Sequence, residues 1–141
     1  MSDILKLSTP FPDNLVKPAP KGKFGSYVAH STVTERLLSI VGPFDMRICE
    51  TFYGDNGNVE GVVLEMTFMI DGQRVTVQEI GDCEQPTNWK TQGARLKDAV
   101  SDGVKRCAMR IGLGLHLWSQ VDYFLENQLT KDGDEDNDDT L

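Results

Sequence analysis

The chain of 141 residues is poor in the residues that build metal and redox centres. It has three cysteines and two histidines, at Cys49, Cys83, Cys107, His30 and His116. The cysteines fit neither a disulfide framework nor the spacing of a zinc site, and neither histidine has a ligand partner at metal-binding distance along the chain. We therefore expect no bound metal, a reducing compartment and a structural role for both histidines.

The sequence also lacks long apolar runs and nucleotide-binding motifs. No apolar run approaches the roughly 20 residues needed to cross a bilayer, and the N-terminus has no signal-peptide pattern. A phosphate loop ending in Gly-Lys-Ser/Thr is missing, and the GLGL segment at Gly112 follows a predicted helix instead of a strand. No set of residues has a catalytic pattern. We expect a cytoplasmic protein that is not an enzyme and uses no cofactor.

The acidic residues are concentrated at the C-terminus. The chain has a formal charge of −8, and from Asp122 onward it has eight acids and one base. The segment over residues 130–141 has almost nothing apolar to bury, so we predict a disordered acidic tail there. Two interpretations remain open. The tail either keeps the protein soluble or imitates nucleic acid and competes for the protein's own basic surface.

The opposite charge is concentrated in one predicted helix that begins at about Gln92. Residues 90–110 have six cations and two acids, a local charge of about +4. The cations are Lys90, Arg95, Lys97, Lys105, Arg106 and Arg110. An apolar stripe of helical period includes Leu96, Val100, Gly103, Val104, Cys107 and Ile111. Asp102 is placed to pair with Arg106 four residues later, on the solvated flank. Such a run is either an ordinary solvated face or a surface for a polyanion.

Residues 1–26 hold four of the six prolines, which predicts an extended arm rich in proline and glycine. Within it, Lys17 and Lys23 lie near Tyr27, and cations mixed with aromatics suit phosphates and stacked bases. Thr32 and Glu35 form a capping-box pattern for a short helix that ends at Gly42.

Three β-rich runs follow, over residues 47–53, 59–70 and 73–80. Asp71 and Gly72 between the last two predict a two-residue hairpin turn. Alternation in the middle run predicts one packed face and one partly solvated face. A final short helix is predicted over residues 119–129. The predicted fold is therefore α+β, a three-stranded antiparallel meander packed on one long helix, with a short N-terminal helix.

Several segments together resemble a known family. They are PFP near the start, Tyr27 followed by VAHSTVTERLLSIVGP, the meander, and KDAVSDGVKRCAMRIGLGLHLW. This pattern resembles the single-strand annealing recombinases of the Rad-fifty-two type, above all their compact bacterial and phage members. The most specific match is DAVSDGVKR, which ends in the Lys105 and Arg106 pair.

The resemblance implies a β-β-β-α core over residues 27–129 that assembles into rings and binds single-stranded DNA. By resemblance and charge, the expected DNA-binding residues are Lys105, Arg106, Tyr27, Lys17, Lys97, Arg110 and Lys23. One departure is Met109, where the family has another arginine. Arg110 comes next, but it points about 100° further round the helix than Met109.

The implied function is ATP-independent binding and annealing of single-stranded DNA in homologous recombination and repair, in the cytoplasm of a bacterium and encoded by the cell or a phage. Expected partners are single-stranded DNA, further copies of the chain, and a single-strand-binding or replication protein. One alternative is protection of DNA ends without annealing, as in relatives of the DdrA type. Another is an interaction protein that acts through its acidic tail without DNA.

Overall fold

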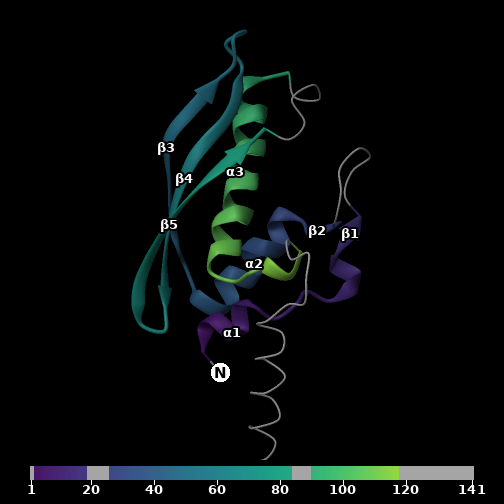
Figure 1. Ribbon diagram of the computed structural model, residues 1–141, viewed down its shortest axis with the longest axis vertical. Helices are drawn as coiled ribbons and strands as arrows, with labels where there is room; N and C mark the ends of the chain where they lie inside the picture. Colours follow the sequence, from purple (N-terminus) through teal and green to yellow (C-terminus); the bar gives the residue numbers. More distant parts are fainter. Residues whose placement is uncertain (1, 19–25, 84–89, 118–141) are drawn as a thin grey trace, which may run out of the picture.

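The computed structural model describes residues 2–18, 26–83 and 90–117, with the backbone alone at positions 26 and 27. Its elements are α1 (Asp3–Leu7), η1 (Asp13–Leu15), β1 (Lys17–Pro18), β2 (Ser26–Tyr27), α2 (His30–Val41), β3 (Asp45–Tyr53), β4 (Val59–Ile70), β5 (Gln73–Asp82), α3 (Gln92–Arg110) and η2 (Leu115–Leu117). The predicted helix over residues 119–129 and the acidic tail lie outside the described residues. The α+β class is confirmed, and α3 separates the sheet from α2 (Figure 1).

The sheet is the predicted antiparallel meander, in the order β3-β4-β5. Asp71 and Gly72 have φ angles of 49° and 79°, so both central positions of the β4–β5 turn adopt the positive φ that a type I′ hairpin requires. The predicted alternation in β4 is also confirmed. Its packed face is fully covered and consists of Val62, Leu64, Met66, Phe68 and Ile70.

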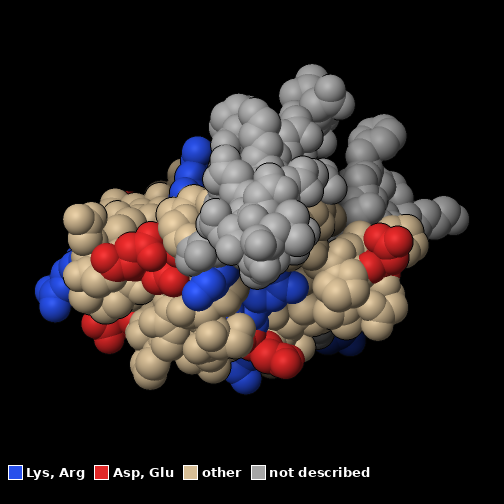
Figure 2. Space-filling view, turned by 90° about the horizontal axis from the view of Figure 1, so that it is seen from below, with Lys and Arg blue, Asp and Glu red and all other residues tan. Residues whose placement is uncertain are grey.

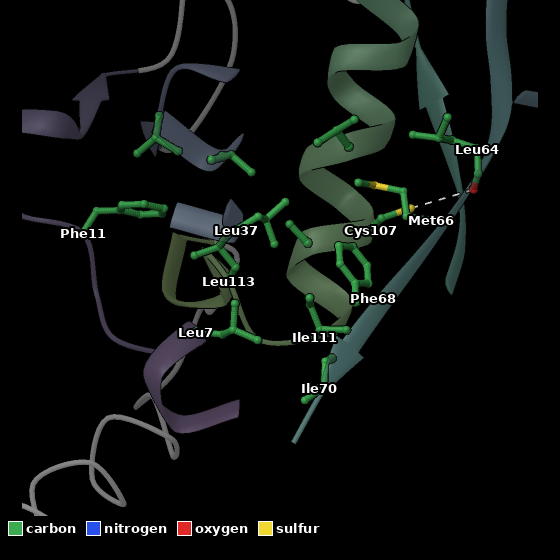
Figure 3. Packing of buried hydrophobic residues seen from close by; sticks show 14 of the residues in the cluster. Leu7, Phe11, Leu37, Leu64, Met66, Phe68, Ile70, Cys107, Ile111 and Leu113 are labelled. Carbon is green, nitrogen blue, oxygen red and sulfur yellow. Dashed lines mark hydrogen bonds between the residues drawn. The ribbon is translucent and has the colours of Figure 1, made fainter. Parts of the chain in front are cut away.

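Helix α3 packs on the buried face of β4 and on β5, as the sequence predicts. We call this face of the sheet the helix side. The closest approach is at two glycines. A Cβ atom on Gly81 would lie 2.6 Å from the backbone nitrogen of Gly103, and nearer still to the carbonyl oxygen of Ala99. Any side chain at Gly81 would therefore push α3 away from the sheet. Cys107 lies deeper in the same interface, with its Sγ directed at the carbonyl oxygen of Leu64 (Figure 3).

The N-terminal segment packs against α2 and the turn that follows α3, and is not only an extended arm. It begins with a helix, α1, and Leu7 and Phe11 are buried in the core beside Leu37 and Leu113 (Figure 3). The prediction was wrong here because the prolines begin only at Pro10. The residues before it are free to form a helical turn, and the Ser2 hydroxyl caps that turn by accepting a hydrogen bond from the Leu5 N–H.

Helix α2 packs against α3 and begins earlier than predicted. Ala29 is its N-cap and has no side-chain capping bond, so Thr32 lies inside the helix and the predicted capping box is wrong. The hydrophobic positions Val33 and Leu37, which face the core, fix the helix more strongly than a polar cap does. The predicted end at Gly42 is confirmed, with a φ of 73°.

Strand β3 lies at the edge of the sheet, away from α3 (Figure 1). Its helix-side residues Met46 and Ile48 are the Cα partners of the buried Met66 and Leu64. They are nevertheless 51% and 42% exposed. The reason is that α3 packs mainly on β4 and β5, so the apolar rows of the core continue onto a strand that this helix leaves open.

Candidate nucleic-acid interface

The flank of α3 that faces β5 holds Arg106 in a fixed position. The buried Asp102, 5% exposed, accepts hydrogen bonds at Oδ2 from the Asp82 backbone N–H and from Arg106 Nε, each at 2.9 Å. The predicted pairing of Asp102 with Arg106 is therefore confirmed. The predicted exposure of Asp102 is wrong, because this carboxylate also binds the backbone N–H of Asp82 at the end of β5 and is buried there. Arg106 is thus anchored to the sheet through one acid.

Arg110 lies on the same flank as Arg106. Arg110 comes four positions after Arg106, which places the two side chains one above the other on the helix, whereas Met109 points elsewhere. The side chain of Arg110 is 61% exposed, and its Nε donates to Glu79 Oε2 on β5. That hydrogen bond is the main cause of a lowered pKa for the Glu79 carboxyl; burial opposes it, and the charge of Arg106 adds to it. Glu79 is therefore close to both arginines.

Lys105 belongs to a different flank of α3, since consecutive residues lie about 100° apart round a helix. Its charge acts on His30, the first residue of α2. Burial, and secondly the charge of Lys105, lower the pKa of the His30 imidazole below its usual value. Lys105 and Arg106, the two cations that the family resemblance picks out, thus lie on different flanks of α3, about 100° apart round the helix.

The structure brings together two of the expected DNA-binding residues near the N-terminus. Strands β1 and β2 pair antiparallel, with Lys17 and Tyr27 as Cα partners. Lys17 is exposed, whereas the side chain of Tyr27 and the whole of Lys23 lie outside the described residues. Lys97 is exposed near the start of α3, about 12 Å along the helix axis from Lys105. It does not join the row that Arg106 and Arg110 form.

One predicted surface cation has a structural role instead. Arg95 is buried, and its Nε donates to the Val59 carbonyl oxygen at 2.8 Å, which ties the start of α3 to the start of β4. The remaining cations are mixed with acids. Figure 2 shows two neighbouring groups of Lys and Arg in the middle of one face, with acidic side chains on both sides. The cationic surface visible there is divided into groups and is not one continuous patch.

Two residues at these flanks, Glu79 and His30, were not predicted to belong to the interface. Glu79 is 31 positions from Arg110 along the chain, and no motif or spacing connects the two. His30 and Lys105 are also far apart along the chain, and only the contact of α2 with α3 brings them close. Only the alternation of β5 gave a partial signal, since it puts Glu79 on the helix side with Val75 and Val77.

Over residues 2–18, 26–83 and 90–117, no group of three or more His, Cys, Asp or Glu residues is arranged to hold a metal ion. No helix that the structure describes is both long enough and apolar enough to cross a membrane. No protein-family model and no curated protein sequence matches the chain.

Proposed function

We propose that the protein binds single-stranded DNA through its phosphates and anneals complementary strands without ATP, in homologous recombination and DNA repair. The observation that supports this most directly is the arrangement of Lys105, Arg106 and Arg110 on α3, within the segment that resembles the annealing recombinases. Both arginines are fixed through Nε by carboxylates. Fixed guanidinium groups are well suited to phosphate oxygens.

Phosphate contacts explain why such a protein would anneal strands. Phosphates are the same at every nucleotide, so binding through Lys and Arg is independent of sequence and falls steeply with salt. It also leaves the base edges open for pairing with a second strand. Lys17, opposite Tyr27 in the β1–β2 pair, would extend the contact beyond α3.

Assembly into a homo-oligomeric ring is part of the proposal, and the open face of β3 supports self-association. Apolar surface that continues a core is typical of contacts between subunits. Met46→Glu would charge this face and is expected to reduce the size of the assembly, measured by light scattering without DNA. Ile80→Glu is the matched control, because Ile80 is equally exposed but lies on the other face of the sheet. An unchanged size for the Met46 variant would exclude this face.

The experiment that tests the function is annealing of two complementary fluorescent oligonucleotides without ATP or magnesium. Lys105→Ala and Arg106→Ala are each expected to weaken binding equally for every sequence and to lower the salt slope by about one. Arg74→Ala on the outer face of β5 removes an exposed cation away from α3 and is the control. Full affinity in both α3 variants would remove this helix from the mechanism.

Two further outcomes of that experiment point to the alternatives. Binding without faster annealing indicates protection of single-stranded ends. No binding at all directs attention to the acidic tail and a protein partner, such as a single-strand-binding or replication protein. If the tail competes with DNA, deletion of residues 131–141 tightens binding, because it removes a polyanion from the protein. Unchanged affinity would leave the tail with a role in solubility.

A further inference from the structure

Glu79 is a fixed carboxylate between β5 and α3. It lies on the helix side of β5, opposite the buried Leu64 of β4, and its side chain is only 17% exposed. Both carboxylate oxygens have partners. Oε2 accepts from Arg110 Nε, and Oε1 accepts from the Ile80 backbone N–H at 3.2 Å. The carboxylate of Glu79 is therefore held from two sides, by the backbone of β5 and by Arg110.

Two arginines converge on this part of the sheet edge. Arg106 and Arg110 are one helical turn apart, so their Cβ atoms lie about 5–6 Å from each other. Like charges at this spacing repel each other and, left alone, turn apart into the solvent. Asp102 holds the first arginine through Nε, and Glu79 holds the second in the same way.

The atom through which Glu79 holds Arg110 decides what remains for a ligand. A guanidinium has one N–H at Nε and four on its two Nη atoms, all in one plane. A bond at Nε fixes that plane and leaves the Nη edge of Arg110 for an anion. Arg106 and Arg110 are each held through their own Nε, so their guanidinium groups form a row along the helix.

We propose that Glu79 is a positioning residue of the DNA interface, which holds Arg110 beside Arg106 so that the two guanidinium groups bind neighbouring phosphates of one strand. This inference rests on the proposed function. It also explains how a chain with Met109 in place of the family's arginine would keep a second arginine in use, since Arg110 reaches the β5 flank and Glu79 fixes it there.

The sign of a mutational effect separates positioning from simple charge. Glu79→Ala removes a negative charge beside two arginines, so electrostatics alone would tighten DNA binding. Loss of positioning predicts the opposite, binding about fivefold weaker and a salt slope lower by about one, because one charge-assisted phosphate contact is lost. Glu79→Gln keeps an oxygen for Arg110 Nε and is expected to bind at least as tightly as the wild type.

A charge-conserving variant keeps the test valid if the alanine variant does not fold. Glu79→Asp retains the charge but shortens the side chain by one carbon, so it is expected to lose the contact and bind as weakly as Glu79→Ala. Electrostatics alone predicts wild-type affinity for it. Circular dichroism of each variant confirms the fold before DNA is added.

A double-mutant cycle identifies the partner of Glu79. In an Arg110→Ala background, Glu79→Ala is expected to have no further weakening effect on DNA affinity. Glu65→Ala is the control, because Glu65 pairs with Arg47 on the outer face of the sheet. Tighter binding by Glu79→Ala, or wild-type binding by Glu79→Asp, overturns the positioning role. Absence of DNA binding by the wild type overturns the proposed function itself.

Discussion

The two flanks of α3 present their cations in different ways. On the β5 flank, Arg106 and Arg110 are each paired with an acid, and both acids also accept a hydrogen bond from the backbone of β5. On the α2 flank, the charge of Lys105 disfavours the protonated form of His30. The β5 flank is part of the hydrogen bonding that holds the fold, whereas the charge on the α2 flank depends on the protonation of His30. Removing a charged side chain should therefore lower the free energy of unfolding on the β5 flank and shift the pKa of His30 on the α2 flank.

The largest effect is expected where α3 meets the sheet, because both flanks depend on that contact. Gly81→Ala places a methyl group against the backbone of Ala99 and Gly103, and should destabilise the fold by about 3 kcal/mol or more. Gly93→Ala, in the first turn of α3, is the control. It meets nothing within 4 Å and should stabilise α3 by about 0.5–1 kcal/mol. Thermal unfolding measures both; equal melting temperatures would contradict the close approach.

A second mutation tests whether the β5 flank is structural. Asp102→Ala removes a buried acid that bonds Arg106 and the Asp82 N–H, and is expected to cost about 3 kcal/mol of unfolding free energy. Lys105→Ala on the α2 flank should change the same quantity by less than about 0.5 kcal/mol. Urea denaturation compares the two variants. Similar losses in both would mean that the flanks do not differ in this way.

The smallest effect concerns pH on the α2 flank. Because the folded pKa of His30 lies below its unfolded value, its contribution to stability is complete above about pH 6.5 and is lost as the pH falls through the folded pKa. Lys105→Met removes one cause of the shift, so the pKa of His30 should rise toward its usual value, as measured by NMR titration. An unchanged His30 pKa in this variant would mean that the charge of Lys105 does not act on His30.

Bound DNA should act on His30 in the same direction. A phosphate at Lys105 offsets the lysine charge, so binding is expected to raise the His30 pKa and to take up a proton. DNA affinity should then increase modestly as the pH falls below about 6.5, because the free protein holds His30 below that usual pKa and bound DNA raises it. His30→Gln should abolish this dependence, and a variant that keeps it would place the titrating group elsewhere.

Local patterns predicted the local structure well. The alternation in β4, the Asp71 turn and the start of α3 at Gln92 are confirmed because each depends on neighbours within a few residues. The capping box at Thr32 failed because tertiary packing overrides a capping preference of about 1 kcal/mol.

The candidate interface was predicted only in part. The Asp102 pair with Arg106 follows from helical spacing, and the structure confirms it. The burial of Arg95 and the contact of Glu79 with Arg110 depend on strands that are more than 30 positions away. A charge count along one helix cannot separate a cation that anchors the fold from one that faces solvent.

The packing of Cys107 against the sheet has a practical consequence. Burial, with the nearby charge of Glu79, raises the pKa of this thiol to about 12, so it stays protonated at neutral pH. Cys83 is buried as well, which leaves Cys49 on β3 as the exposed cysteine of the three. A maleimide dye should thus label the native chain at one defined point. Placed on the open strand and away from α3, that dye would report the arrival of a neighbouring copy by self-quenching while DNA occupies the helix.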